Sequence, residues 1–114
     1  MEDCLFCKIV AGEIPSRIAL QDEHGVVFHD INPQAPTHLL VVPRKHIAAL
    51  TDVAEGDDLL MGRLCRLAAA AAQQAGIAAG GFRVVVNNGP DAGQAVAHLH
   101  LHVLGGRAMR WPPG

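Results

Sequence analysis

The chain has 114 residues, half of them hydrophobic, and a net charge of −2 when its histidines are neutral. This length predicts a single compact domain over residues 1–114, and the nine scattered basic residues argue against a nucleic-acid partner. The chain does not open with a basic segment followed by a long apolar run, so we expect no membrane association and a cytoplasmic protein.

The first half of the chain predicts one short helix followed by extended segments. In order, these are a helix over Leu5 to Val10, an extended passage over residues 17–20, and strands over residues 25–29 and 38–42. Gly12 ends the helix, and Pro15 forces the extended passage because its ring fixes φ. Prolines and an asparagine in residues 30–36 indicate a loop between the two strands.

The second half predicts one long helix and two more strands. Leucines and alanines recur at helical spacing over residues 57–75, acidic residues open this stretch, and Gly76 ends it. We expect Cys65, on its leucine side, to lie in the core. Strands are predicted over residues 82–87 and 98–104. The sum is the α+β class, an antiparallel sheet of about five strands with one long helix and a short N-terminal helix.

Three histidines, His98, His100 and His102, alternate with Leu99 and Leu101. Successive side chains of a strand point to opposite faces, so this spacing predicts three imidazoles on one face and two leucines in the core. Histidine acts as a nucleophile, a proton carrier or a metal ligand near neutral pH. From the residues alone, nucleophilic catalysis and metal binding remain in competition.

The loop before the histidines is rich in glycine and in side-chain amides. Its members are Asn87, Asn88, Gly89, Gly93 and Gln94. Because glycine has no Cβ and tolerates unusual dihedral angles, backbone and side-chain amides can closely approach an anion here. Beside the three histidines, this composition favours a bound phosphate.

The segment over residues 94–104, Gln-Ala-Val-Ala-His-Leu-His-Leu-His-Val-Leu, resembles the histidine triad motif, His-φ-His-φ-His-φ-φ with φ hydrophobic, that names the HIT superfamily. Four other segments resemble its Hint branch: Phe-His-Asp-Ile at 28–31, Pro-Gln-Ala-Pro-Thr-His at 33–38, Val-Pro-Arg-Lys-His at 42–46, and the ending over residues 104–114. The resemblance covers nearly the whole chain in order and spacing. It implies a single HIT domain over residues 1–114 with the HIT-like fold.

The resemblance also implies a nucleotide hydrolase. In this family the middle histidine, here His100, attacks the α-phosphorus of a purine nucleoside phosphoramidate or related ester, and water then cleaves the nucleotidyl-histidine intermediate. Such an attack needs one free ring nitrogen while an acceptor holds the proton of the other. His102 resembles the residue that contacts the phosphate oxygens, and His38 the residue that orients the cluster. The alternatives are a dinucleoside polyphosphate hydrolase of the Fhit type and a nucleotide-binding or zinc-dependent interaction module with little catalysis.

The nucleotide-binding positions of the family also have counterparts here. Asp30 resembles the carboxylate that accepts hydrogen bonds from both ribose hydroxyls. The apolar base pocket corresponds to Phe6, Ile9, Ile14, Phe28 and Ile31. The positions that hold the phosphate or leaving group correspond to Asn87, Gly93, Gln94 and the backbone around Val96. Ala95 departs from the pattern, because Hint proteins commonly carry a serine there, and a lost donor predicts chemistry slower by about 10²-fold or a different leaving group.

Cys4 and Cys7 form a C-x-x-C pair near the N-terminus. Three cysteines disfavour a disulfide framework, and a tetrahedral zinc site needs two ligands beyond this pair. Some bacterial HIT proteins and the galactose-1-phosphate uridylyltransferases are similar in combining such a pair with two histidines. This resemblance implies a structural zinc on Cys4, Cys7, His46 and His98. A metal-free thiol pair and a redox motif are the alternatives.

The last residues, Trp111-Pro112-Pro113-Gly114, cannot continue a sheet or helix because proline lacks an amide proton and fixes φ. The resemblance implies a homodimer in which residues 107–114 cross to the partner. Trp111 would then contribute to the partner's substrate site.

Overall fold

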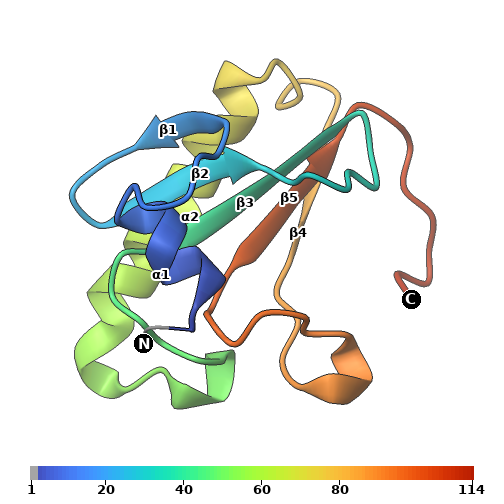
Figure 1. Cartoon of the computed structure of the whole chain (residues 1–114). Helices are drawn as coiled ribbons and strands as arrows, with labels where there is room; N and C mark the ends of the chain where they lie inside the picture. The colour runs from blue at the N-terminus through green and yellow to red at the C-terminus, as the bar shows by residue number, and fades with distance from the viewer. Residues whose placement is uncertain (1–2) are drawn as a thin grey trace.

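The structure is a computed structural model that describes residues 3–114. Its helices and strands are α1 (Leu5–Val10), β1 (Ile18–Gln21), β2 (Gly25–His29), β3 (Thr37–Pro43), α2 (Asp58–Gln74), β4 (Phe82–Val85) and β5 (Leu101–Gly105) (Figure 1). Three short 3-10 turns, which the sequence did not predict, lie at Leu50–Asp52, Glu55–Asp57 and Pro90–Ala92. Within the described residues, no helix is long and apolar enough to cross a membrane.

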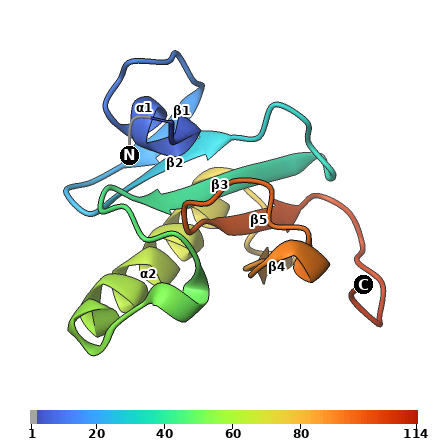
Figure 2. The ribbon, with the colours of Figure 1, turned by 60° about the horizontal axis from the view of Figure 1, so that its bottom comes forward.

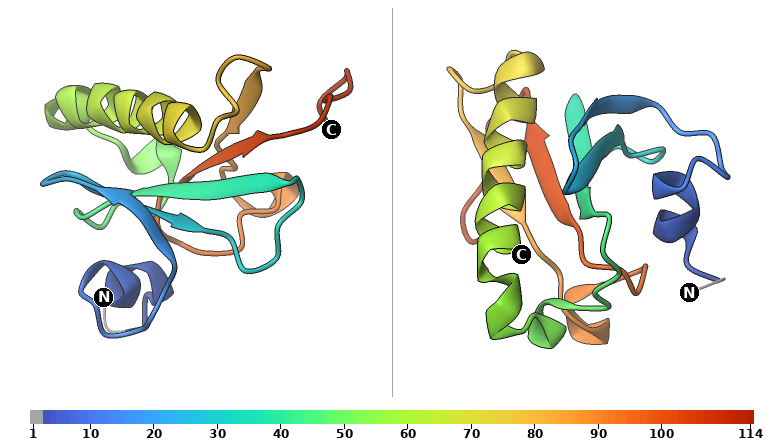
Figure 3. Two further views of the ribbon diagram at one scale, coloured as in Figure 1. Left: turned by 90° about the horizontal axis from the view of Figure 1, so that it is seen from above. Right: turned by 90° about the vertical axis from the view of Figure 1, so that its left-hand side faces the viewer.

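The five strands form one antiparallel sheet in the order β1-β2-β3-β5-β4. Helix α2 covers one face of this sheet and the shorter α1 lies against the other, as Figures 2 and 3 show. The α+β class and the five-stranded sheet predicted from the sequence are therefore confirmed.

Strand β3 is buried on both faces and shows how the two sides of the sheet are built. Leu39 and Val41 belong to the cluster that packs under α2, whereas Leu40 and Val42 belong to the cluster around Phe6 of α1. This is the alternation that a pleated strand imposes. Leu40 is paired with Phe28 on one side and with His102 on the other, so all three residues lie in one row across the sheet.

A buried carboxylate, that of Asp57, lies directly before α2. Asp57 accepts a hydrogen bond from the N–H of Ala54 at 3.0 Å through Oδ2, and its Oδ1 lies 2.6 Å from Nζ of Lys45. The side chain of Asp57 thus satisfies the backbone donor that opens the 3-10 turn Glu55–Asp57, and this turn leads directly into α2.

Two sequence predictions about strand length were wrong. Strand β4 ends at Val85, two residues before the predicted end, and β5 begins at Leu101 instead of at residue 98. The N–H of Leu99 donates to the carbonyl of Ile47 at 2.6 Å, so this segment bonds to the connection after β3 and not to a sheet neighbour. His98 and His100 therefore precede the strand, and only His102 lies within it.

Cys65 is exposed, contrary to the expectation that it belongs to the core. The buried residues of α2 are Leu64, Leu67, Ala68, Ala71 and Ala72. Each helical residue is rotated by about 100° from the one before it, so Cys65 turns away from the stripe that Leu64 and Leu67 define.

Candidate functional site

His100 is held in one tautomer by the backbone carbonyl of His98. Its ring is buried, and Nδ1 lies 2.7 Å from the carbonyl oxygen of His98. Because a carbonyl only accepts, the ring hydrogen of neutral His100 sits on Nδ1. Nε2 then carries a free electron pair, as nucleophilic attack requires. Phe6 packs edge-on against the ring with centroids 5.0 Å apart, which fixes its orientation.

His38 and His102 form a hydrogen-bonded pair across β3 and β5. The N–H of Gln34 donates to Nδ1 of His38 at 3.0 Å, so the hydrogen of His38 is on Nε2. That Nε2–H donates to Nδ1 of His102 at 2.9 Å, and Oδ2 of Asp30 lies 3.5 Å from Nε2 of His38. His102 is therefore left with its own hydrogen on Nε2.

Burial keeps this pair neutral. It lowers the pKa of His102 to about 4, with the neighbouring rings of His100 and His38 acting in the same direction. Burial also lowers the pKa of His38, and the carboxylate of Asp30 opposes this only in part. At neutral pH, His102 is thus an uncharged donor. Nδ2 of Asn87 lies 3.5 Å from Nε2 of His102, so two donors are available to a shared acceptor such as a phosphate oxygen.

Asp30, His38 and His102 also place three potential metal-ligand atoms within 4.8 Å of one another. The hydrogen bond from Gln34 argues against a metal at this cluster. It occupies the lone pair of His38 Nδ1, so Nε2 of the neutral ring carries the hydrogen and has no lone pair to offer. The three side chains form a hydrogen-bonded chain.

A cavity of about 960 Å³ opens beside His100 and His102. Of the residues proposed for nucleotide binding, Phe6, Ile9, Ile14, Phe28, Asp30, Ile31 and Val96 line it. Ile31 is 98% exposed, so it stands at the rim and not in the wall. Ala95, singled out in the sequence as the position beside the leaving group, also lines it. The lining residues that the sequence did not indicate are Leu5, Pro15, Ser16, Arg17, His29 and Leu40.

Four predicted binding residues are not part of this cavity lining. Asn87 reaches the site only through its contact with His102. Gly93 adopts a left-handed conformation with φ of 82° at the end of the Pro90–Ala92 turn. The side chain of Gln94 is used within the protein, because it accepts from the N–H of Gly89 and donates to the carbonyls of Ala48 and Val96. Trp111 is 81% exposed.

Four potential zinc ligands come together at the N-terminal end of α1, with one ligand atom from each within 4.8 Å of the others. They are Cys4, Cys7, His46 and His98. The Cys4 Sγ to His98 Nδ1, Cys7 Sγ to His46 Nδ1 and Cys7 Sγ to His98 Nδ1 distances are 3.3, 3.2 and 3.5 Å. Tetrahedral zinc with ordinary bond lengths would separate sulfur and nitrogen ligands by about 3.5 Å. Nε2 of His98 donates to the carbonyl of Pro43 at 2.9 Å, which leaves Nδ1 free to face the sulfurs. The four residues therefore fit a zinc ion.

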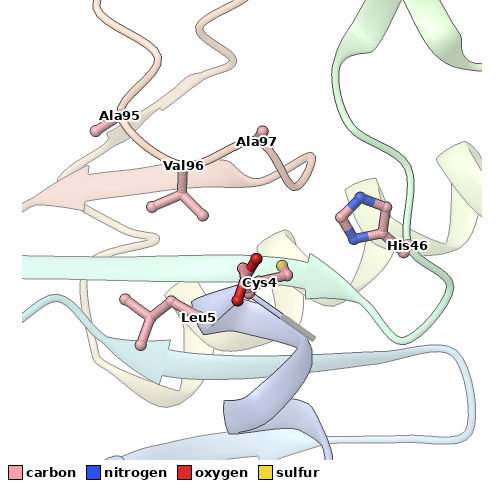
Figure 4. Close-up of a pocket in the computed structure, with 7 residues that line it drawn as sticks. Cys4, Leu5, His46, Ala95, Val96 and Ala97 are labelled. Carbon is pink, nitrogen blue, oxygen red and sulfur yellow. The ribbon is translucent and has the colours of Figure 1, made fainter. Parts of the chain in front are cut away.

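A second cavity, of about 480 Å³, lies next to this cluster and is drawn in Figure 4. Its lining includes Cys4 and His46 on one side and residues 95–97 on the other. Leu5, Ala95 and Val96 line both cavities, so the two spaces adjoin. Among residues 3–114, Asp3 is the only lining residue that carries a carboxylate, and no lysine or arginine of this range lines the cavity.

Residues 11–109 match the HIT domain family. The chain belongs to the HIT family. It is 49% identical to a HIT family hydrolase from Legionella pneumophila, whose structure matches with a TM-score of 0.96 over 98% of this chain and 100% of that one. A 14 kDa zinc-binding protein from Zea mays is 45% identical, over 96% of this chain and 87% of the relative. A zinc-bound histidine triad family protein from Mycobacterium smegmatis is 33% identical, with a TM-score of 0.78 over 93% of this chain and 76% of that one.

Two backbone groups of this HIT domain escaped the sequence reasoning although they set the histidine tautomers. These are the N–H of Gln34, which contacts His38, and the carbonyl of Pro43, which contacts His98. A backbone group leaves no residue-type signal. The prolines around Gln34 were the only sequence sign that its loop has a defined shape.

Proposed function

We propose that this HIT protein is a nucleotide hydrolase of the Hint type, which cleaves purine nucleoside 5′-phosphoramidates or related nucleoside monophosphate esters. The observation that carries the proposal is His100, whose Nε2 is left free by the bond from Nδ1 to the His98 carbonyl at the wall of an apolar cavity. A histidine whose Nε2 lone pair is free and borders a cavity can act as a nucleophile, which a purely structural core histidine cannot.

In the proposed reaction, Nε2 of His100 attacks the α-phosphorus, the P–N bond to the leaving amine breaks, and the amine takes a proton from solvent. The intermediate carries the nucleotide on Nε2 while Nδ1–H still donates to the His98 carbonyl, which stabilises the positive charge of the substituted ring. Water then attacks phosphorus and releases a proton to solvent, the bond to Nε2 breaks with its electron pair returning to the ring, and nucleoside monophosphate leaves. His102 Nε2–H and Asn87 Nδ2 donate to phosphate oxygens throughout.

The rest of the nucleotide fits the larger cavity. Phe6, Ile9, Ile14 and Phe28 supply an apolar and partly aromatic wall for a purine base. Asp30 takes the ribose hydroxyls. Its Oδ1 accepts the N–H of Asn32 at 2.8 Å, but a carboxylate has about four acceptor positions, so capacity for the sugar remains.

The second cavity supports an amine as the leaving group. It adjoins the reaction cavity at Ala95 and Val96, where the group departing from phosphorus would lie. A nucleoside polyphosphate leaving group carries several negative charges and would require basic side chains to compensate them. The described residues of the lining include no lysine or arginine, and Asp3 would repel such a group. This favours phosphoramidates over the dinucleoside polyphosphates of the Fhit type.

We propose a structural zinc on Cys4, Cys7, His46 and His98. Four protein ligands close a tetrahedral site, so the metal fastens elements together and takes no part in catalysis. Here it would tie α1 to the segment before His100. The names of the maize and mycobacterial relatives, one zinc-binding and the other zinc-bound, support this assignment. Burial raises the pKa of the Cys7 thiol in the metal-free protein, whereas zinc binding would lower it, because a coordinated thiol is deprotonated.

We further propose a homodimer in which residues 107–114 reach the partner. Trp111 supports this, because an indole that is 81% exposed in one chain leaves a large apolar surface in water.

Binding a purine nucleotide such as AMP with little turnover is the second candidate function. Ala95 favours it, since a methyl group stands where a hydroxyl donor would serve the leaving group.

The decisive experiment uses an adenosine 5′-phosphoramidate of a fluorescent amine. We expect steady hydrolysis and, in samples quenched during turnover, mass spectrometry should find one AMP added covalently at His100. His100→Ala should form no adduct and show no hydrolysis while still binding AMP. Absence of hydrolysis in the wild-type protein, full activity in His100→Ala, or faster cleavage of a diadenosine polyphosphate would overturn the proposal.

A further inference from the structure

Arg107 stands where the chain leaves β5, outside the lining of both cavities, and the proposed function gives it no role. Its Nη2 donates to the carbonyl of Gln34 at 3.0 Å, and its Nη1 donates to the carbonyl of Ala108 at 3.2 Å. One guanidinium therefore connects the root of the C-terminal tail with the loop between β2 and β3.

Arg107 and His38 contact the two backbone groups of one residue, Gln34. The N–H of Gln34 donates to Nδ1 of His38, while the carbonyl of Gln34 accepts from Arg107. Without the Gln34 bond, the hydrogen of His38 can move to Nδ1. His102 would then have to donate through Nδ1, and its Nε2 would present a lone pair to a phosphate oxygen. Two acceptors would repel each other at the position where a donor is needed.

The start of the C-terminal tail and the loop between β2 and β3 also meet close to Gln34. Thr37 pairs with Gly105 at the end of the sheet, and Gly106 follows with a φ of +91°. A Cβ added at Gly106 would lie 2.9 Å from Cβ of Pro36, which shows how closely the two backbones approach. The contact between Arg107 and Gln34 thus belongs to a packed junction and is not an isolated surface bond.

We propose that Arg107 is a positioning residue: by binding the carbonyl of Gln34 it fixes the backbone of that residue, keeps its N–H on Nδ1 of His38, and so maintains the tautomer of His38 and the Nε2 donor of His102. This proposal rests on the phosphate-binding role proposed above for His102. Oδ2 of Asp30, 3.5 Å from Nε2 of His38, favours the same tautomer, so loss of Arg107 weakens the arrangement without abolishing it. We expect Arg107→Ala to lower kcat by about 3-fold to 10-fold, the effect of one partly exposed hydrogen bond, with little change in KM.

The test compares Arg107→Ala, Arg107→Lys and the control Arg110→Ala. Arg110 lies on the same tail and is exposed, and within residues 3–114 its side chain makes no hydrogen bond or ion pair. Side-chain nitrogen chemical shifts from NMR report the tautomers of His38 and His102 directly. We expect the wild type and Arg110→Ala to show Nε2–H alone at both residues. Arg107→Ala should show a mixture, and Arg107→Lys an intermediate result, because an ammonium can still donate to Gln34.

Unchanged tautomers in Arg107→Ala, or equal losses of kcat in Arg107→Ala and Arg110→Ala, would overturn the proposal. The two hypotheses fail separately. If the wild-type protein hydrolyses no phosphoramidate, the proposed function fails, while the nitrogen shifts of Arg107→Ala still decide whether Arg107 sets the tautomers.

Discussion

Nε2 of His38 lies 2.9 Å from Nδ1 of His102, and this bond joins a buried residue of β3 to the site at β5. It decides which nitrogen of His102 carries the hydrogen. If the Nε2 donor of His102 stabilises charge on the transferring phosphate, then His38 influences the chemical step although it touches no substrate.

Replacing His38 should therefore slow chemistry more than binding. We expect His38→Ala to lower kcat by about 10²-fold, the usual cost of one lost donor at a transition state, with a small change in KM. His38→Gln should retain more activity, because its amide can still donate to Nδ1 of His102. Single-turnover kinetics with the phosphoramidate substrate measure both effects. Equal kcat values in His38→Ala and wild type would contradict the role of the pair.

The lowered pKa of His102 gives a direction for the effect of pH on stability. Its pKa is about 4 in the folded protein and near 6.5 in an unfolded chain, so the unfolded state binds more protons between these values. The free energy of unfolding should therefore be largest above pH 6.5 and should fall as the pH decreases from 6.5 through 4.

Urea titrations at pH 7 and pH 5 check this effect. His102→Gln removes the titrating ring, so its loss of unfolding free energy between the two pH values should be smaller than that of the wild type. His38 contributes in the same direction, since burial also lowers its pKa, so some dependence should remain. An identical loss in both proteins would show that His102 is not buried in its neutral form.

The zinc proposal predicts one metal ion per chain in the purified protein. Cys7→Ala should lose it, because Cys7 Sγ approaches both His46 and His98. Since metal binding stabilises the folded state, we expect the Tm to fall by about 5 °C or more, and a chelator should do the same to the wild type. Elemental analysis and thermal melts measure these quantities.

Cys65→Ala is the matched control, since Cys65 is an exposed cysteine on α2 and lies outside the cluster. It should keep both the metal and the Tm of the wild type. Metal retained in Cys7→Ala, or lost equally in Cys65→Ala, would contradict the assigned ligands.

Local sequence patterns determine some features of this fold with correct bounds. The strand over residues 25–29 was predicted with its observed bounds, because valine-rich runs between turn residues indicate a buried strand without outside information. The helix over 57–75 was predicted to within one residue at each end, since its leucine period and terminal signals are local.

The error at the start of β5 came from a contact distant in sequence, unlike that at Cys65, which came from the local phase of the helix. Nothing in residues 98–104 indicates that Leu99 bonds to the Ile47 carbonyl, and this bond keeps His98 outside the strand. His98 consequently joins the cysteines while His100 lines the cavity. The residue types of the site were recognisable from the motifs, whereas the tautomers depend on backbone groups of Gln34 and Pro43 that the fold alone supplies.

Ala95 offers a gain-of-function test, because it lines both the reaction cavity and the smaller cavity beside the metal cluster. Its methyl group cannot donate a hydrogen bond to a leaving group, whereas a serine hydroxyl at this position can. We expect Ala95→Ser to raise kcat for the phosphoramidate by up to about 10²-fold, with AMP affinity little changed. Ala97→Ser, in the smaller cavity only, is the control and should leave kcat near the wild-type value. If both serine variants matched the wild type, the leaving group would have to depart away from residues 95–97, and the slow step would lie elsewhere.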